Sequence, residues 1–346
     1  MPSAIEREYI SKTLIELLNI PSPTGATESA IHFLSQQLES LGYQANQTTK
    51  GGLMVVVPGK EEPPRALTAH VDTLGAMVKE IKANGRLKLT PIGSFAWNTV
   101  EGEGCQVHIR SGDPIRGSLL LTKASVHVHS SEVDKTERNA DTLEVRVDAR
   151  VEDADSVRQL GLEVGDFVSF DPRAEAGPAG FIRSRHLDDK AGVACMLAAL
   201  KRLREESIQP THTTYFHFSN YEEVGHGAAG GFPSDLAEIV AVDMAAVGKG
   251  QNSDEFHVTI CVKDSGGPYH AGLTQRLRQL AEAGDIPFKL DVYPYYGSDA
   301  EALLRAGADV QAALIGPGVD ASHNYERTHI EALEATTELI MTYISS

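Results

Sequence analysis

Hydrophobic residues in the first forty positions recur with the period of an α-helix, in two runs separated by the turn sequence of residues 21–25. Each run places its apolar side chains on one helical face. These side chains are Ile10, Leu14, Leu17 and Leu18 in the first run and Ile31, Leu34, Leu38 and Leu41 in the second. Two β-rich runs follow at residues 53–57 and 66–70, with a charged turn predicted at 59–64. The chain is therefore expected to open with two helices and two strands.

The pattern changes between about residues 74 and 170, where short alternating segments and frequent glycines replace the helical period. Such segments are typical of a small β domain. The predicted strands are residues 106–109, 118–122, 125–129 and 143–147, and residues 153–160 form the predicted helix. We therefore interpret residues 73–173 as a β-rich domain of their own.

Helices and strands alternate again after about residue 177. The predicted helices are 190–204, 269–283 and 330–343, and the predicted strands are 213–219, 239–242 and 257–262. This alternation favours an α/β fold, a mixed β-sheet flanked by helices on both faces. The simplest organisation is one α/β domain formed by residues 1–72 and 174–346, with the β domain inserted between its two parts.

Composition and charge narrow the range of partners. The 346 residues include 48 acidic and 31 basic side chains, a net charge of −17. Such a chain repels phosphate groups, so nucleic acid and anionic membranes are not expected partners. The longest uncharged apolar stretch, residues 193–200, is far shorter than the ~20 residues of a membrane helix. With three scattered cysteines as well, the sequence predicts a soluble, cytoplasmic protein.

Acidic residues and histidines gather where the predicted strands end, which is where open α/β sheets place their ligand sites. The five places are His70 to Asp72, Asp188 with Asp189, Glu222 with Glu223, Asp243, and the segment 322–328 that opens the last predicted helix. Taken singly, each has a structural explanation as an interior histidine, a helix N-cap or a solvated loop. Together, however, carboxylates at one sheet edge repel one another unless a cation neutralises them.

A site for two metal ions would use this set of side chains. Two divalent ions ~3.5–4 Å apart need a shared carboxylate, further nitrogen and oxygen ligands, and a separate general base. Two histidines and three carboxylates would supply the ligands and leave one carboxylate over. If strand geometry continues past residue 219, Glu222 and Glu223 point to opposite sides, so that one can bind metal while the other faces the bridging water.

At these residues the sequence resembles a known family. The motifs are His-x-Asp at 70–72, Leu-Asp-Asp-Lys-Ala-Gly at 187–192, Glu-Glu-Val-Gly at 222–225, Asp243, and Ser-His-x-Tyr-Glu-Arg-Thr at 322–328. In this order they resemble the dinuclear metallo-aminopeptidases of the glutamyl aminopeptidase, or tetrahedral (TET) aminopeptidase, family. Residues 297–300 are similar to that family's Gly-Gly-Thr-Asp-Ala stretch, except that Tyr296 replaces a glycine and Ser298 a threonine.

The resemblance implies two divalent metal ions per subunit, zinc with cobalt or manganese as alternatives. The implied ligands are His70 and Asp243 on one ion, Glu223 and His323 on the other, and Asp188 shared between the two. The resemblance makes Glu222 the general base, and Asp72 the residue that hydrogen-bonds His70 and fixes its tautomer. It also implies a cis peptide between Asp188 and Asp189.

The activity expected from this site is removal of N-terminal residues from peptides. A hydroxide that bridges the two ions attacks the scissile carbonyl, while Glu222 takes up a proton and passes it to the leaving amine. Two alternatives stay open: a metal-dependent deacylase or amidohydrolase acting on a small modified amino acid or peptide, and a non-catalytic, oligomeric metal-binding scaffold. The presence of Glu222 beside a full ligand set weighs against the scaffold.

Other implications concern the substrate pocket and the assembly. The candidate substrate-binding residues are Tyr221, His226, Ser298 and Asp299. The resemblance implies that the insert is a β-barrel or PDZ-like domain used in dimerisation, and that the protein is a dimer-based homo-oligomer of up to twelve subunits. His127 and His129 alternate like one face of a strand and could together hold a metal, although histidines at or near the surface are the simpler interpretation.

Overall fold

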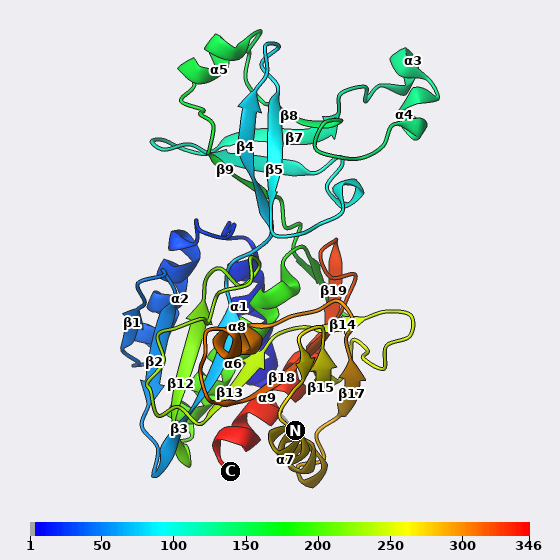
Figure 1. Ribbon diagram of the computed structural model, residues 1–346. Coiled ribbons are helices and arrows are strands. Elements are labelled where there is room, and N and C mark those ends of the chain that lie inside the picture. The colour runs from blue at the N-terminus through cyan, green and yellow to red at the C-terminus, as the bar shows by residue number, and fades with distance from the viewer. Residues whose placement is uncertain (1–3) are drawn as a thin grey trace. The chain divides into compact units, whose positions relative to one another are not determined.

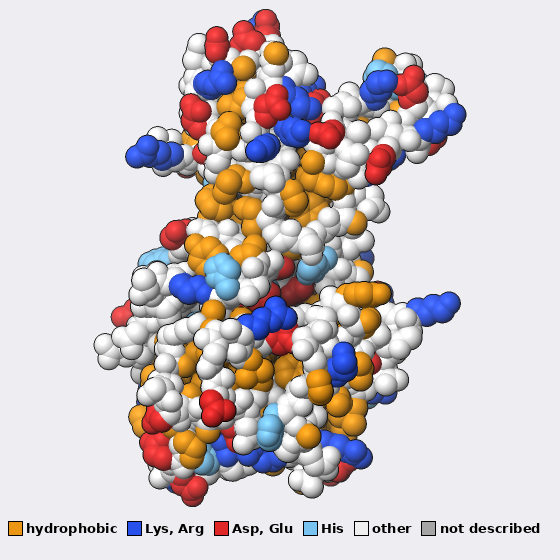
Figure 2. Space-filling view, in the orientation of Figure 1, with side chains coloured by type: hydrophobic (Ala, Val, Ile, Leu, Met, Phe, Trp, Pro, Cys, Tyr) orange, Lys and Arg blue, Asp and Glu red, His pale blue; other side chains and the backbone are white. Residues whose placement is uncertain are grey.

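The computed structural model describes residues 4–346, which divide into two compact units (Figure 1). One unit combines the chain up to Asp72 with Arg173–Ser346, and the other is Thr73–Pro172. Within the described residues, no helix combines the length and the apolar composition needed to cross a bilayer. On the face that Figure 2 shows, basic and acidic side chains are interspersed.

The larger unit is built on a mixed β-sheet whose central strands β12, β3, β13 and β18 run parallel. The sheet follows the order β1 (Ala45–Gln47), β2 (Leu53–Val57), β12 (His212–Ser219), β3 (Glu61–His70), β13 (Glu238–Val242), β18 (Gln311–Asp320), β19 (Glu326–His329), β11 (Phe181–Ser184) and β10 (Glu175–Ala176). Joined to this path are β14 (Ala245–Val247), β15 (Val258–Asp264), β16 (Gly267–Pro268) and β17 (Phe288–Val292). The central strands are buried on both faces, which explains their continuous apolar runs.

Helices cover both faces of this sheet (Figure 1). They are α1 (Ala4–Leu18), α2 (Glu28–Ser40), α6 (Leu187–Glu205), α7 (Ala271–Ala283), α8 (Asp299–Arg305) and α9 (Ile330–Ile344). Helix α6 is almost wholly buried and packs against α1, α9 and β3. Helix α8 packs with Ala66, Ile239 and Ala312, which belong to a second apolar cluster. The predicted helix-flanked α/β sheet is confirmed.

The smaller unit is a closed β-barrel. Its strands are β4 (Gly75–Ile81), β5 (Leu87–Ile92), β8 (Leu143–Val147), β7 (Ile115–Leu121), β6 (Gly104–His108) and β9 (Phe167–Phe170), in the order in which they pair. Alternate side chains of these strands fill a core of their own that includes Val78, Leu89, Val107, Leu119 and Val168. Short elements complete the unit, namely η1 (Trp97–Thr99) and α5 (Ala154–Gln159), which Asp153 caps. The predicted inserted β-barrel is therefore confirmed as a fold.

The strand predicted at residues 125–129 is wrong. Val126–His129 forms the short helix α3, and Glu132–Lys135 forms α4. His127 is exposed and His129 partly exposed, and two helical positions separated by one residue do not face the same way. The two histidines therefore do not form the common face that a shared metal would need. Five residues of alternating pattern were too few to distinguish a strand from a solvent-exposed helical turn.

Two further predictions about element boundaries are also wrong. The charged turn predicted at residues 59–64 is largely part of β3, which begins at Glu61 and pairs with the start of β12. The segment 322–328 does not open the last helix. It forms a turn followed by β19, and α9 begins at Ile330 after the N-cap residue His329.

Candidate metal centre

The parallel strands bring the predicted ligands to one edge of the sheet. His70 is the last residue of β3, and its neighbour across the ladder, Ser219, is the last residue of β12. Asp243 directly follows β13, the next parallel strand. The first turn of α6 approaches this edge closely, because a Cβ atom on Gly192 would lie 2.2 Å from the carbonyl oxygen of Val242. Glycine at position 192 thus allows Asp188, at the start of α6, to reach Asp243.

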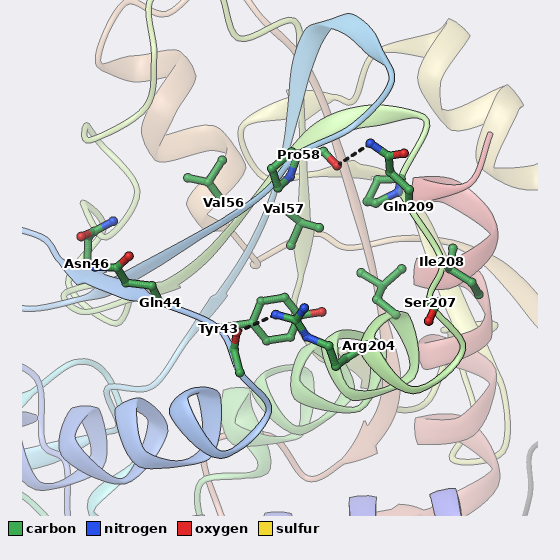
Figure 3. Close-up of a pocket in the computed structure, with 13 residues that line it drawn as sticks. Tyr43, Gln44, Asn46, Val56, Val57, Pro58, Arg204, Ser207, Ile208 and Gln209 are labelled. Atoms are coloured by element: carbon green, nitrogen blue, oxygen red, sulfur yellow. Dashed lines mark hydrogen bonds between the residues drawn. The ribbon is translucent and has the colours of Figure 1, made fainter.

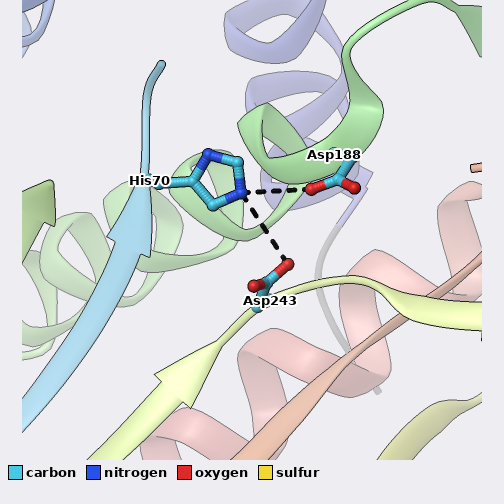
Figure 4. Close-up of side chains that lie close together, drawn as sticks. All are labelled: His70, Asp188 and Asp243. Carbon is cyan, nitrogen blue, oxygen red and sulfur yellow. Dashed lines mark hydrogen bonds and ion pairs between the residues drawn. The ribbon is translucent and has the colours of Figure 1, made fainter. Parts of the chain in front are cut away.

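Three of these side chains form a first cluster of His70, Asp188 and Asp243 (Figure 4). The Nε2 atom of His70 lies 3.1 Å from Oδ1 of Asp188 and 4.0 Å from Oδ1 of Asp243. The three donor atoms lie within 4.8 Å of one another, as ligands of one metal ion must. All three residues are buried, and His70 is only 1% exposed.

A second cluster of Asp188, Glu223 and His323 uses the other oxygen of the same aspartate. The Nε2 atom of His323 lies 3.3 Å from Oδ2 of Asp188 and 3.6 Å from Oε2 of Glu223. His323 comes from the turn between β18 and β19, and Glu223 from the turn after β12. The structure therefore brings all five predicted ligands together, with Asp188 common to both clusters.

Burial and the closeness of several carboxylates to one another determine the pKa shifts in and beside the two clusters. Burial, and then the charge of Asp188, raises the pKa of Asp243 to about 7. Burial is also the main cause that raises the pKa values of Glu222 and Glu223 well above the usual range. For His70, burial acts to lower the pKa, but the bond to Asp188 and the charges of nearby carboxylates outweigh it, so the pKa is raised.

Among the buried atoms without a hydrogen-bond partner in the part of the chain that the structure describes are two carboxylate oxygens. They are Oδ1 of Asp243, in the first cluster, and Oε1 of Glu223, in the second. Unpartnered buried carboxylate oxygens are costly, and a divalent cation would satisfy them. The mixture of imidazole nitrogen and carboxylate oxygen suits zinc and similar ions. The residues present therefore fit a pair of divalent metal ions.

Asp72 acts differently from the prediction. The Nδ1 atom of His70 bonds the backbone oxygen of Asp72 at 2.8 Å, whereas the Asp72 carboxylate lies 3.7 Å away. The carboxylate instead accepts hydrogen bonds from the Thr24 hydroxyl and from the backbone N–H groups of Glu222 and Glu223. Asp72 thus orients His70 through its backbone and holds the two glutamates through its side chain.

Glu222 and Glu223 diverge, although not by continuing the strand as assumed from the sequence. The chain leaves strand geometry after Ser219 and turns, with Tyr221 at φ 76°. Oε2 of Glu222 lies 3.7 Å from His70 Nε2, whereas Glu223 faces His323. Glu222 therefore stands beside the first cluster without belonging to either set of ligands.

Two acidic residues that received no predicted role hold the ligands in place. Glu326 accepts hydrogen bonds from the backbone N–H groups of Leu187, Asp188 and His323, so it joins the two segments that carry ligands. Asp189 accepts from the backbone N–H groups of His70 and Gly192. The Asp188–Asp189 peptide is cis, as the family resemblance implied. The presence of Glu326 within the 322–328 motif was the available signal for its role.

The candidate substrate-binding residues lie around the turn after β12. The rings of Tyr221 and His226 stack with centroids 5.1 Å apart, and the Lys50 ammonium lies 5.9 Å from the Tyr221 centroid. Lys50, which the sequence analysis missed, donates to the carbonyl oxygens of His226 and Gly227.

Ser298 and Asp299 are buried and make internal hydrogen bonds. Asp299 accepts from the Ser219 hydroxyl and the backbone N–H of Ala228, and Ser298 bonds the Tyr269 hydroxyl at 2.7 Å. Asp299 therefore ties the start of α8 to the end of β12. A direct contact of either residue with substrate stays a prediction.

A surface pocket of about 550 Å³ lies near the start of β12, away from the strand ends that carry the clusters (Figure 3). Its walls include Tyr43, Val57 and Arg204. The Arg204 guanidinium donates to the carbonyl oxygens of Leu41 and Gly42 and lies over the Tyr43 ring. The polar groups of Arg204 are thus used within the protein, and the pocket does not resemble a reactive site.

Comparison with known proteins identifies similar sequences. The family model for M42 glutamyl aminopeptidase matches residues 51–339. The Bacillus subtilis (strain 168) protein named "Putative aminopeptidase YhfE" is 49% identical over 332 residues, which cover 96% of each chain. A glutamyl aminopeptidase of Lactococcus lactis is 26% identical over 204 residues, or 56% of this chain and 55% of its own.

Solved structures with the same fold cover nearly all of the chain. The aminopeptidase APDkam598 from the archaeon Desulfurococcus kamchatkensis has a TM-score of 0.87 and 22% identity, and covers 98% of this chain and 95% of its own. The TET1 peptidase of Pyrococcus horikoshii, which can assemble into a tetrahedron or a large octahedral shell, has a TM-score of 0.85 and 22% identity. It covers 97% of this chain and 99% of its own.

Proposed function

This chain belongs to the M42 glutamyl aminopeptidase family and is a metal-dependent aminopeptidase, and we propose that the two clusters sharing Asp188 are its catalytic centre. One ion would be held by His70, Asp188 and Asp243, and the other by Asp188, Glu223 and His323. The observation that carries this proposal is the division of the Asp188 carboxylate, whose Oδ1 faces one histidine and whose Oδ2 faces the other.

The chain's own residues account for the proton transfers of peptide hydrolysis. When bound, two divalent ions would polarise the scissile carbonyl and make water more acidic. Glu222 is the carboxylate beside this centre that is left over from the ligand sets, and its buried position favours uptake of a proton. We assign to it the role of general base towards water and then of general acid towards the leaving amine. Asp72 supports this role because it fixes the backbone of Glu222.

The acidity of the centre also supports selectivity for a free N-terminus. A peptide's α-ammonium group is attracted by a site rich in buried carboxylates, whereas an acylated N-terminus has no such charge. An aminopeptidase would therefore use the same cluster to orient its substrate, and N-acetylated peptides are expected to be poor substrates. This difference separates aminopeptidase activity from the deacylase alternative.

The proposal also covers the identity of the metal ions, the assembly of the subunits and the location of the protein. Zinc is the proposed ion, with cobalt or manganese as alternatives, because the donor set is nitrogen and oxygen. A homo-oligomer is proposed because the TET1 peptidase of similar fold forms tetrahedral and octahedral assemblies. The β-barrel unit is the proposed dimerisation domain, and a cytoplasmic location remains the expectation.

Replacement of Glu222 tests the catalytic assignment. Glu222→Gln keeps the size of the side chain but removes its basicity, so kcat on an unblocked peptide should fall by about 10²–10⁴-fold. The purified variant should still contain two metal ions per chain, measured by elemental analysis after dialysis. Wild-type activity should be lost on chelation and restored by zinc, cobalt or manganese.

The adjacent glutamate provides a matched control. Glu223→Gln removes one proposed ligand at the neighbouring position and should lower the metal content as well as the activity. The assignment is wrong if Glu222→Gln loses both ions, or if it retains the activity of the wild type. The aminopeptidase proposal itself is wrong if the fully metal-loaded wild type cleaves N-acetylated substrates but not free peptides.

A further inference from the structure

Tyr296 lies between β17 and α8, and the carboxylates of the proposed catalytic centre act on its hydroxyl group. The hydroxyl oxygen is buried and has no hydrogen-bond partner within residues 4–346. Burial is the main cause that raises the pKa of Tyr296 well above its usual range, and the charges of Asp243, Asp188 and Glu222 add to the rise, so these carboxylates are near enough to act on the hydroxyl. A buried hydroxyl without a partner is unfavourable and needs an explanation.

The Tyr296 side chain is held in this position by its surroundings. Its ring packs against Tyr293, with centroids 5.3 Å apart. Its backbone oxygen accepts hydrogen bonds from the N–H of Ser265 at 3.0 Å and from the Ser265 hydroxyl at 2.6 Å. The hydroxyl is therefore a fixed donor, which suits stabilisation of charge that develops during a reaction.

The neighbouring Asp243 does not account for this donor. The Tyr296 hydroxyl is close enough to Asp243 to act against the rise of that group's pKa, yet neither the hydroxyl nor Oδ1 of Asp243 has a partner in hydrogen-bonding geometry among the described residues. In the proposed function, the Asp243 oxygen binds a cation. The Tyr296 O–H group is then available to a polar atom that arrives with the substrate. A phenol, with a pKa of about 10, is protonated and able to donate at neutral pH.

We propose that the Tyr296 hydroxyl donates a hydrogen bond to the oxyanion that forms on the scissile carbonyl of the peptide, an inference that rests on the proposed function. As the water oxygen bonds to the carbonyl carbon, the electron pair of the C=O π bond moves to the carbonyl oxygen, and Glu222 takes the water proton. When that pair returns, the C–N bond breaks and the amine nitrogen takes the proton from Glu222. Tyr296 keeps its own proton throughout.

The substitution Tyr296→Phe tests this role, because it removes the hydroxyl and keeps the ring. We expect kcat on an unblocked peptide to fall about 10²–10³-fold, as for loss of one oxyanion donor. The KM and the content of two metal ions per chain should change little. Tyr293→Phe is the matched control, because that hydroxyl is also buried but bonds Ser253 at 2.8 Å, and its kcat should equal that of the wild type.

A second measurement separates contact with the oxyanion from a structural role. A phosphinic dipeptide analogue carries tetrahedral oxygens like those of the intermediate, and Tyr296→Phe should weaken its binding by the same factor as kcat. Binding of the product amino acid should not change.

Other results would overturn the proposal. Wild-type kcat in Tyr296→Phe would show that the hydroxyl does not touch the oxyanion, and loss of metal would show that it acts on Asp243 instead. Both results leave the proposed function intact. A metal-loaded wild type without peptidase activity would overturn the proposed function, and this inference with it.

Discussion

Strand β13 carries a buried carboxylate at each end, and the two have opposite surroundings. At the first residue of the strand, Glu238 lies 3.2 Å from Arg65, pairs with Arg276 and accepts a hydrogen bond from the Tyr343 hydroxyl at 2.8 Å. Directly after the last residue, Asp243 faces other carboxylates and His70, and one of its oxygens has no hydrogen-bond partner in the described chain.

These opposite surroundings shift the pKa values of the two carboxyl groups in opposite directions. Burial acts to raise both, but the bonds to Arg276 and Tyr343 outweigh it and lower the pKa of Glu238. At Asp243, burial and the charge of Asp188 outweigh the lowering effects of His70 and of the Tyr296 hydroxyl, so its pKa is raised to about 7. The comparison shows that burial of a carboxylate does not mark a site. A functional site is indicated where the fold buries negative charge and leaves the neutralising cation to come from outside.

The largest effect that would sharpen this comparison is expected at Asp243. Asp243→Asn removes a proposed ligand, so the ion at the first cluster should be lost and activity should fall by about 10³-fold or more, because polarisation by a metal contributes several kcal/mol. The metal-free variant should be at least as stable as metal-free wild type, since repulsion with Asp188 is relieved. Metal analysis, peptidase assays and thermal unfolding measure the three quantities. Retention of both ions and of activity would contradict the proposed ligand set.

At Glu238 we expect a smaller effect, and one on stability rather than on activity. Glu238→Gln leaves the buried Arg65 and the partly buried Arg276 without their anion, which should lower the free energy of unfolding by about 3 kcal/mol. The kcat of the folded variant should match the wild type, because Glu238 lies at the opposite end of the strand from the clusters. Urea unfolding and a peptidase assay test this. A stable variant with impaired catalysis would reverse the comparison.

The smallest effect concerns how the difference in unfolding free energy between wild type and Glu238→Gln depends on pH. The folded-state pKa of Glu238 is lowered, so its stabilising contribution is complete above the unfolded value for glutamate, about 4.3. It is lost as the pH falls through the folded-state pKa. The gap in unfolding free energy between wild type and Glu238→Gln should therefore be constant near neutral pH and narrow in acid. A gap that widens in acid would show that the ion pairs do not cause it.

Prediction from sequence worked where the signal is local. The periodic apolar positions of α1 and α9 identify these helices, because one face of each must be buried whatever it packs against. Strand β18 was missed, although it lies in the middle of the sheet. Its Gly316 and Gly318, with Pro317 between them, are typical of a turn in isolation. In the fold, a Cβ on Gly316 would lie 1.7 Å from the carbonyl oxygen of Asp243, so the glycine is required by a neighbour distant in sequence.

The sequence by itself determined the α/β class, the inserted β-rich domain and the residue types that could bind metal, because periodicity and motifs are properties of the chain alone. Only the tertiary structure decided how those residues are shared. It divided Asp188 between two histidines and bonded the Asp72 carboxylate to the backbone of the turn that carries Glu222 and Glu223. These relations join segments more than a hundred residues apart, and they depend on the register of parallel strands and on close approaches that no local pattern records.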